Sequence, residues 1–223
     1  MMMPFEGGLA GTANGTFVLS VVAAALYLPM TARPLSWRRM VAKTAGVALL
    51  AVLSFVAGGP WLLTLALALS ALGDACLARE GEGAFMAGLA SFLGAHLAYA
   101  VLFAGAGSAD LFADELWRLL VALAMIAFAG LFYRRLRPVL PAGMAVPVAV
   151  YVVAILAMGV TALFLPALVV IVGAVLFMAS DAILATERFL LAEASAHRRW
   201  SRPAVWVLYY AGQLAITLGV LLA

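Results

Sequence analysis

Two aspartates lie in stretches of the sequence that are otherwise strongly apolar. Asp74 interrupts LALALSALGDACLARE, residues 65–80, and Asp181 interrupts FMASDAILATER, residues 177–188. A carboxyl group in such a stretch either hydrogen-bonds to a neighbouring helix, binds an ion, or acts as an acid in chemistry. Because two such groups occur in similar surroundings, we interpret them as the centre of a site for acid–base chemistry.

Other polar side chains accompany the aspartates. His96 and Tyr99 are three residues apart on one helical face, and Ser70 precedes Asp74 by about one helical turn. Lys43 begins an apolar segment, where it either pairs with an aspartate, binds a phosphate oxygen, or extends to the membrane surface. For each of these residues, packing or hydrogen bonding between helices is the alternative to a role in a site. The candidates for catalysis are Asp74, Asp181 and His96, and those for substrate binding are Lys43, Ser70, Tyr99, Ser180, Tyr209, Tyr210 and Gln213.

Several common chemistries have no motif in this sequence. The single cysteine, Cys76, and two distant histidines, His96 and His197, predict neither a metal site nor a disulfide framework. Serine hydrolases with G-x-S-x-G, zinc hydrolases with H-E-x-x-H and proteins with glycine-rich phosphate loops are also disfavoured. We therefore expect no metal and no cofactor.

The composition predicts an integral membrane protein. Of its 223 residues, 67% are hydrophobic and 10% are charged, whereas soluble domains are roughly half apolar and about a quarter charged. The first apolar segment follows an N-terminus with Glu6 and no basic residue, so we expect a retained helix rather than a signal peptide. No loop is long enough for a soluble domain, which predicts a single membrane domain over residues 1–223.

Charge clusters, prolines and glycines divide the chain into eight apolar segments. A spanning helix needs roughly 20 mostly apolar residues, and the sequence predicts an all-α bundle of eight such helices. The sixth segment is crowded by prolines, so seven spans are the alternative. The predicted spans are about 15–32, 38–57, 60–79, 83–105, 115–133, 143–161, 166–188 and 203–222.

The basic residues favour eight spans over seven. Twelve of the 13 lysines and arginines fall in alternate loops, and Arg118 is the exception. Because positive loops face the cytoplasm, eight spans place both termini on the non-cytoplasmic side. The five tryptophans also lie near segment ends. Because membrane topology explains the basic residues, the net charge of +3 does not predict nucleic acid as a partner.

The third and seventh segments resemble each other around their aspartates, as do the fourth (GAHLA, 94–98) and eighth (AGQLA, 211–215). Either chance or a duplication into two parallel four-helix repeats explains the match. Counting residues places Asp74 and Asp181 at a similar depth, on the order of 10 Å from the cytoplasmic boundary. By the same counting, His96 lies deeper. Matched depth predicts that the two carboxyl groups share one site.

Four motifs resemble the YhhN-like membrane protein family. They are G-D at 73–74, S-F-x-x-x-H-x-x-Y at 91–99, S-D at 180–181 and Y-Y-x-x-Q at 209–213. The similarity spans the second to eighth segments. Family members often have Lys-Pro at the start of the second helix, whereas here Lys43 is followed by Thr44.

The resemblance implies an eight-helix fold and a lysoplasmalogenase activity. Such an enzyme hydrolyses the vinyl ether of a lysophospholipid with water, giving a fatty aldehyde and glycerophosphoethanolamine or glycerophosphocholine. Protonation of a vinyl ether gives an oxocarbenium-like cation, a problem that glycosidases solve with two carboxyl groups. Since two nearby carboxyl groups do not readily both ionise, we expect one aspartate to donate the proton and the other to stabilise the cation, with Lys43 on the phosphate.

Two other functions fit the same residues. The aspartates could couple protons to a transporter or flippase of a small amphiphile, or the chain could be a non-catalytic membrane scaffold. The composition, rich in alanine, leucine and glycine, favours a bacterial inner membrane. The sequence leaves the head-group preference and the oligomeric state open.

Overall fold

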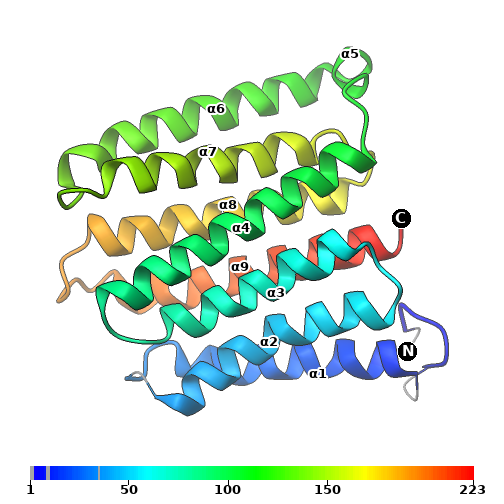
Figure 1. Ribbon diagram of the computed structural model, residues 1–223, viewed down its shortest axis with the longest axis horizontal. Helices are drawn as coiled ribbons and strands as arrows, with labels where there is room; N and C mark the ends of the chain where they lie inside the picture. Colours follow the sequence, from blue (N-terminus) through cyan, green and yellow to red (C-terminus); the bar gives the residue numbers. More distant parts are fainter. Residues whose placement is uncertain (1–2, 9–10, 35) are drawn as a thin grey trace.

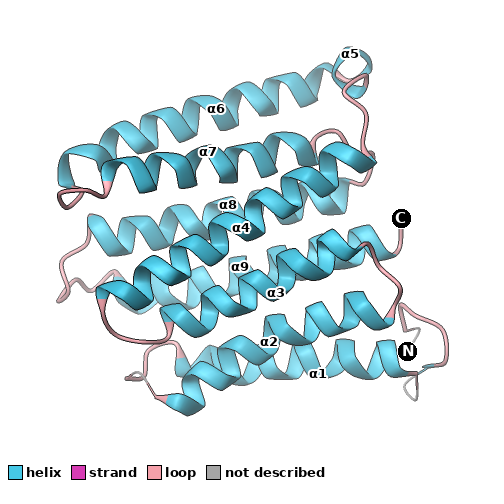
Figure 2. Cartoon of the chain, in the orientation of Figure 1, coloured by secondary structure: helices cyan, strands magenta, loops and turns pink. Residues whose placement is uncertain are grey.

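The computed structural model describes residues 3–8, 11–34 and 36–223, and all regular structure in them is helical (Figure 2). This confirms the predicted all-α class. Eight of the helices are long, namely α1 (Thr12–Tyr27), α2 (Trp37–Val56), α3 (Trp61–Leu77), α4 (Glu82–Ala106), α6 (Leu116–Leu136), α7 (Ala145–Ala162), α8 (Leu168–Phe189) and α9 (Arg198–Leu221). The short ones are η2 (Leu28–Met30), α5 (Leu111–Asp114) and η3 (Arg137–Val139).

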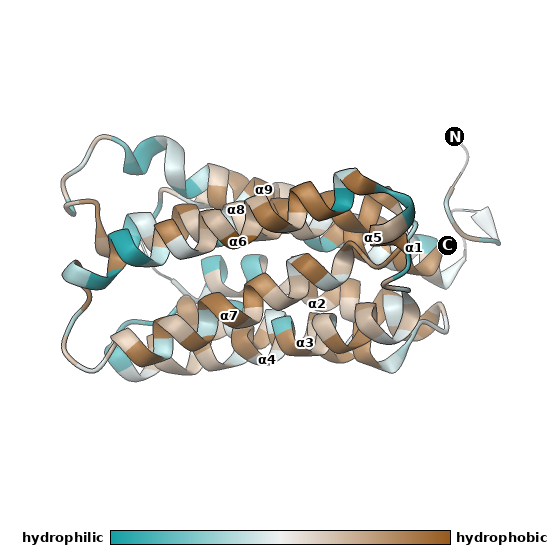
Figure 3. Cartoon of the chain, turned by 90° about the horizontal axis from the view of Figure 1, so that it is seen from above, coloured by the Kyte–Doolittle hydropathy of each residue, from teal (hydrophilic) through white to brown (hydrophobic). Residues whose placement is uncertain are grey.

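Seven helical segments of the described chain are long and apolar enough to cross a membrane, when α1 is counted together with the η2 turn that continues it. The eighth, α3, is equally apolar in character but has only 17 residues. Hydrophobic residues dominate the helix bodies, and hydrophilic residues gather at the end of the bundle away from the chain termini (Figure 3). The protein is therefore a multi-pass integral membrane protein.

The helices form a bundle whose centre consists of α3, α4, α8 and α9 (Figure 1). The pair α1 and α2 covers one edge of this centre, and α6 and α7 cover the other. The two ends of the chain lie at the same end of the bundle (Figure 1). The loops α1–α2, α3–α4, α6–α7 and α8–α9 lie at the opposite end, which we call the basic end because it carries most of the arginines.

Two predicted spans differ from the observed helices by more than three residues. The last helix begins at Arg198 rather than at 203, with Pro203 inside it. Side chains of this added turn, Arg198 and Ser201, both hydrogen-bond to Glu187 on α8, which holds the turn in place. The first helix ends at Tyr27 rather than at 32, because a 3-10 turn containing Pro29 follows it.

Two glycines allow α8 and α9 to pack with their backbones in contact. A Cβ atom at Gly173 would lie 2.8 Å from the carbonyl oxygen of Gly212, and one at Gly212 would lie 2.8 Å from that of Gly173. Small residues at a helix interface allow such close packing in membranes, where dispersion rather than the hydrophobic effect holds helices together. The contact fixes Asp181 on α8 relative to Tyr209 on α9.

Arg118, the exception to the charge pattern, is a buried structural residue. Its side chain is 2% exposed, and its Nη1 donates hydrogen bonds to the carbonyls of Leu163 (2.8 Å) and Leu165 (2.7 Å). Its Nε donates to Glu115 at 3.1 Å, and this bond, with a second from Trp117, lowers the pKa of the Glu115 carboxyl group. The cation thus satisfies carbonyls at the C-terminal end of α7, where positive charge is favourable.

We expect Arg118→Gln to destabilise the protein by about 2–4 kcal/mol, because two buried carbonyls lose charged donors. The melting temperature of the protein in detergent measures this loss. Arg134→Gln, on an exposed residue at the other end of α6, is the matched control and should melt like the parent. Equal melting temperatures for the two variants would show that the Arg118 contacts do not stabilise the fold.

Candidate active site

Asp74 lies in the centre of the bundle and is held by residues of two other helices. Its side chain is fully buried, and Oδ1 lies 2.8 Å from Nζ of Lys43 on α2. Its Oδ2 accepts a hydrogen bond of 2.8 Å from the hydroxyl group of Tyr209 on α9. The structure thus supplies the cation that the local sequence around Asp74 lacks.

Asp181 has a different set of partners. Its Oδ2 accepts a hydrogen bond of 2.6 Å from Tyr151 on α7 and lies 3.6 Å from Nε2 of His96 on α4. The His96 ring is fully buried against Phe177 and Tyr151, and neither ring nitrogen has a hydrogen-bond partner within the described chain. Asp181 is therefore surrounded by a phenol and an imidazole, whereas Asp74 is paired with an ammonium group.

A buried polar network lies behind Asp74, one helical turn further from the basic end. Gln213 donates a hydrogen bond of 2.9 Å to Ser70 and accepts one from Tyr99. All three side chains are buried. Because the network joins α3, α4 and α9, it fixes the helices that carry Asp74, His96 and Tyr209.

Both aspartates line one polar cavity of about 520 Å³. The cavity extends from the loops at the basic end, where Arg33, Arg39 and Arg202 line it, to Asp74 and Asp181 in the interior. Among the contacts of the described residues there is no direct hydrogen bond between the two carboxyl groups. The predicted shared location is thus present, with separate hydrogen bonds for each acid.

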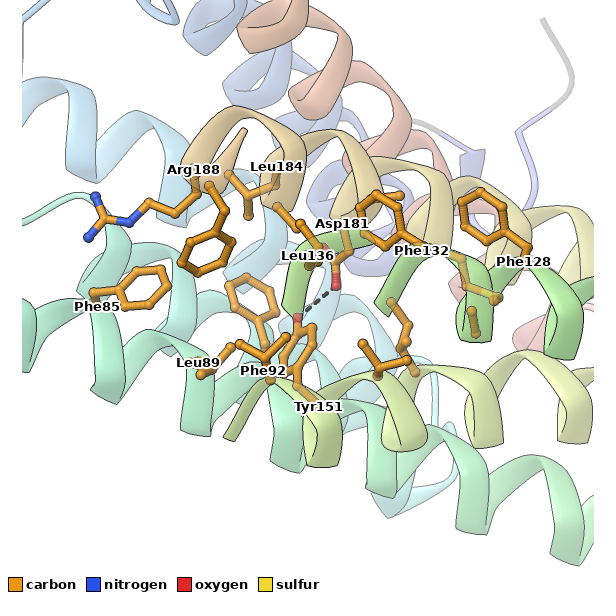
Figure 4. A pocket seen from close by; sticks show the side chains of 18 of the residues that line it. Phe85, Leu89, Phe92, Phe128, Phe132, Leu136, Tyr151, Asp181, Leu184 and Arg188 are labelled. Atoms are coloured by element: carbon orange, nitrogen blue, oxygen red, sulfur yellow. Dashed lines mark hydrogen bonds between the residues drawn. The ribbon is translucent and has the colours of Figure 1, made fainter. Parts of the chain in front are cut away.

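A second, narrower cavity is lined almost entirely by apolar side chains of α4, α6, α7 and α8. Arg188 and Phe85 lie at one end of it and Phe128 lies at the other, with Asp181 and Tyr151 between them (Figure 4). The hydrogen bond between these last two faces the cavity (Figure 4). Four residues line both the polar and the apolar cavity, namely Leu77, Phe92, Asp181 and Leu184.

Comparison with known proteins identifies the family. The model of the YhhN family matches residues 38–220, which include both aspartates and every helix that lines the apolar cavity. The chain belongs to the YhhN family. No solved structure matches it.

Curated relatives of this YhhN protein carry one functional name. It is 36% identical to the human protein "Lysoplasmalogenase TMEM86B", in an alignment that covers 84% of this chain and 77% of the relative. It is also 39% identical to "Lysoplasmalogenase" of Mycobacterium bovis and to that of Mycobacterium tuberculosis, over 71% of this chain. The chain spans 59% of the length of these mycobacterial relatives, less than two thirds.

The structure divides the predicted site residues of this YhhN protein into two groups. Those that line the polar cavity are Lys43, Asp74, Ser180, Asp181 and Tyr209. The others lie behind the cavity wall, namely Ser70, His96, Tyr99, Tyr210 and Gln213. Two hydroxyl groups of the predicted set are engaged in packing between helices, since Ser180 donates to the carbonyl of Val205 and Tyr210 hydrogen-bonds to Ser20.

Sequence reasoning missed Tyr151, Arg39 and Arg202. Tyr151 lies in the middle of the apolar helix α7, and only the polarity of its hydroxyl group distinguished it from its neighbours in the sequence. The two arginines belong to the basic loops and were explained by topology alone.

Within the described residues, no three His, Cys, Asp or Glu side chains are grouped so that they could hold a metal ion.

Proposed function

We propose that this YhhN protein hydrolyses the vinyl ether bond of lysoplasmalogens. The observation that carries the proposal is the position of Asp181, on the wall shared by a polar and an apolar cavity. A lysoplasmalogen has a polar glycerophosphate head and an apolar alkenyl tail, and its vinyl ether joins the two. A substrate with its head in the polar cavity and its tail in the apolar one presents this bond to Asp181. The name shared by the curated relatives supports the same reaction.

The surroundings of the two aspartates support different roles. Asp74 has an ammonium group at 2.8 Å, which favours the carboxylate. Asp181 has no cation as close, and the apolar side chains around it favour the neutral acid. We therefore assign Asp181 as the proton donor and Asp74 as the fixed negative charge that stabilises the developing cation.

The reaction then proceeds in three steps. Asp181 transfers its proton to the vinyl carbon that bears the alkyl chain, and the carbon bound to oxygen becomes an oxocarbenium ion. Water adds to this second carbon and returns a proton to the Asp181 carboxylate, which gives a hemiacetal. The hemiacetal collapses to a fatty aldehyde and the glycerol hydroxyl group of glycerophosphoethanolamine or glycerophosphocholine. This use of one acid and one carboxylate follows the logic of glycoside hydrolysis.

Neighbouring side chains would position the two acids. Tyr151 donates to Asp181 and leaves the other carboxyl oxygen free to hold the proton. Tyr209 likewise donates to Asp74, whose other carboxyl oxygen is paired with Lys43. His96, with no hydrogen bond of its own in the described chain, lies where it could orient Asp181 or the attacking water.

The membrane topology that we propose has eight spans, with α3 included. The termini would lie on the non-cytoplasmic side, since the basic loops lie at the opposite end of the bundle. The pairs α3–α4 and α8–α9 would be the centres of two parallel repeats, each contributing one aspartate. We propose a bacterial inner membrane as the location, on the composition noted above.

Incubation of the purified protein with lysoplasmenylethanolamine tests the function. Free fatty aldehyde and glycerophosphoethanolamine should appear in equal amounts, as measured by mass spectrometry. A transporter would move the lipid between leaflets of a vesicle and release neither product. Absence of aldehyde with a folded protein would therefore reject the hydrolase.

The apolar cavity predicts a limit on the length of the alkenyl chain. Ala129 on α6 is buried and lines this cavity beside Phe128. Ala129→Phe would fill part of the space and should lower kcat/KM for an 18-carbon chain roughly tenfold relative to a 10-carbon chain. Ala127→Phe, on an exposed residue of the same helix, is the matched control. The same chain-length profile in both variants would show that the tail lies elsewhere.

A further inference from the structure

The polar cavity has an excess of positive charge at its entrance. Among the described residues, Glu187 is the only acidic one that lines this part. Its carboxylate already binds Nη1 of Arg198 at 3.0 Å and accepts a hydrogen bond from Ser201. Arg202 lies on the cavity side of the same carboxylate, with Nε at 3.2 Å from it. One carboxylate thus faces two guanidinium groups, and one positive charge remains uncompensated.

Arg39 adds a second uncompensated charge. Its guanidinium group donates to the carbonyls of Thr31 and Arg33 and to the hydroxyl group of Tyr27. None of these acceptors is a carboxylate, and no ion pair involves Arg39 or Arg33 in the described chain. The three hydrogen bonds hold the guanidinium group of Arg39 in place on the cavity wall.

Lys43 is not available as the anion site of this cavity. Its Nζ is committed to Asp74, and its side chain is only 20% exposed. An anion that took Lys43 would leave the buried carboxylate of Asp74 without its cation, which is costly. The anion site suggested by the charges is therefore at the entrance, nearer to the loops.

We propose that Arg39 and Arg202 bind the phosphodiester of the lysolipid head group. The proposal rests on the proposed function and names a subsite within it. Guanidinium groups match the geometry of phosphate oxygens and often bind them in pairs. Arg33 adds positive charge to the same entrance.

The dimensions of the substrate agree with this subsite. Asp181 and Glu187 are six residues apart on α8, which corresponds to about 9 Å along the helix axis. Five bonds of the glycerol unit separate the vinyl ether oxygen from phosphorus, and fully extended they span about 6 Å. The difference is within the reach of the Arg202 side chain, which contacts Glu187 and lines the cavity, so a phosphate bound by Arg202 would leave the vinyl ether near Asp181.

The test is equilibrium binding of two saturated ether analogues that this acid chemistry does not cleave. One is 1-O-hexadecyl-glycerophosphoethanolamine, and the other is 1-O-hexadecylglycerol, which has no phosphate. Arg39→Gln and Arg202→Gln should each weaken binding of the phosphorylated analogue about tenfold. Their affinity for hexadecylglycerol should stay within about twofold of the parent. Arg38→Gln, on an exposed neighbour that does not line the cavity, should change neither affinity.

Three outcomes would overturn the subsite. The first is an equal loss of affinity for both analogues, which would indicate a structural role of the arginines. The second is no loss of affinity for either analogue. The third is that inorganic phosphate displaces the phosphorylated analogue as effectively as glycerophosphoethanolamine does. The last result would assign the arginines to a free anion instead of a lipid head group. Because this binding requires no turnover, failure of the subsite and failure of the hydrolase function give different results.

Discussion

The Asp181→Asn variant should lose aldehyde release from lysoplasmenylethanolamine by a factor of about 100 to 10,000, the usual contribution of a general acid. Asparagine keeps the size of the side chain and can still accept the hydrogen bond from Tyr151, but it has no proton to give to carbon. Substrate binding should change little, so the loss should appear in kcat. Initial rates at several substrate concentrations, with aldehyde measured by mass spectrometry, separate kcat from KM.

Asp114→Asn is the control for this experiment. Asp114 is an exposed aspartate at the end of the short helix α5, which lines neither cavity. Its variant should keep the parent rate, and both variants should keep the parent melting temperature within a few degrees. Turnover near the parent value in Asp181→Asn would remove Asp181 from the mechanism.

The sequence predicts much of this arrangement because burying charge in a membrane is costly. Apolar segments of about 20 residues can satisfy their backbone groups only as helices, so their positions follow from hydropathy. Two carboxyl groups in such helices must face inward, and counting from the basic loops gives them a similar depth. The common cavity of Asp74 and Asp181 was therefore predictable without knowledge of how the helices pack.

The lateral order of the helices was not predictable in the same way. Hydropathy does not show that α7 lies beside α8 with Tyr151 facing Asp181, because a tyrosine in a membrane helix satisfies its hydroxyl group with many partners. Counting residues placed His96 deeper than the aspartates, yet its Nε2 lies 3.6 Å from Asp181. The axis of α4 is tilted across the bundle (Figure 1), so counting residues along this helix overestimates the depth of His96 in the membrane.

The Lys43→Met variant is expected to have the largest effect on stability. Methionine fills a similar volume, but Asp74 would remain fully buried without its cation. Breaking a buried ion pair on one side costs about 3–5 kcal/mol. We expect a clear fall in melting temperature and a loss of activity, since Asp74 would then tend to take up a proton and could not stabilise a cation.

The double variant Lys43→Met/Asp74→Asn separates these two effects. With both charges removed, no charge is left buried alone, and most of the lost stability should return. Activity should not return, because the carboxylate that we propose to stabilise the cation is still absent. If Lys43 instead bound the substrate phosphate, Lys43→Met would raise KM, leave the melting temperature unchanged and show no coupling to Asp74. The double-mutant cycle therefore decides whether the lysine belongs to the aspartate or to the substrate.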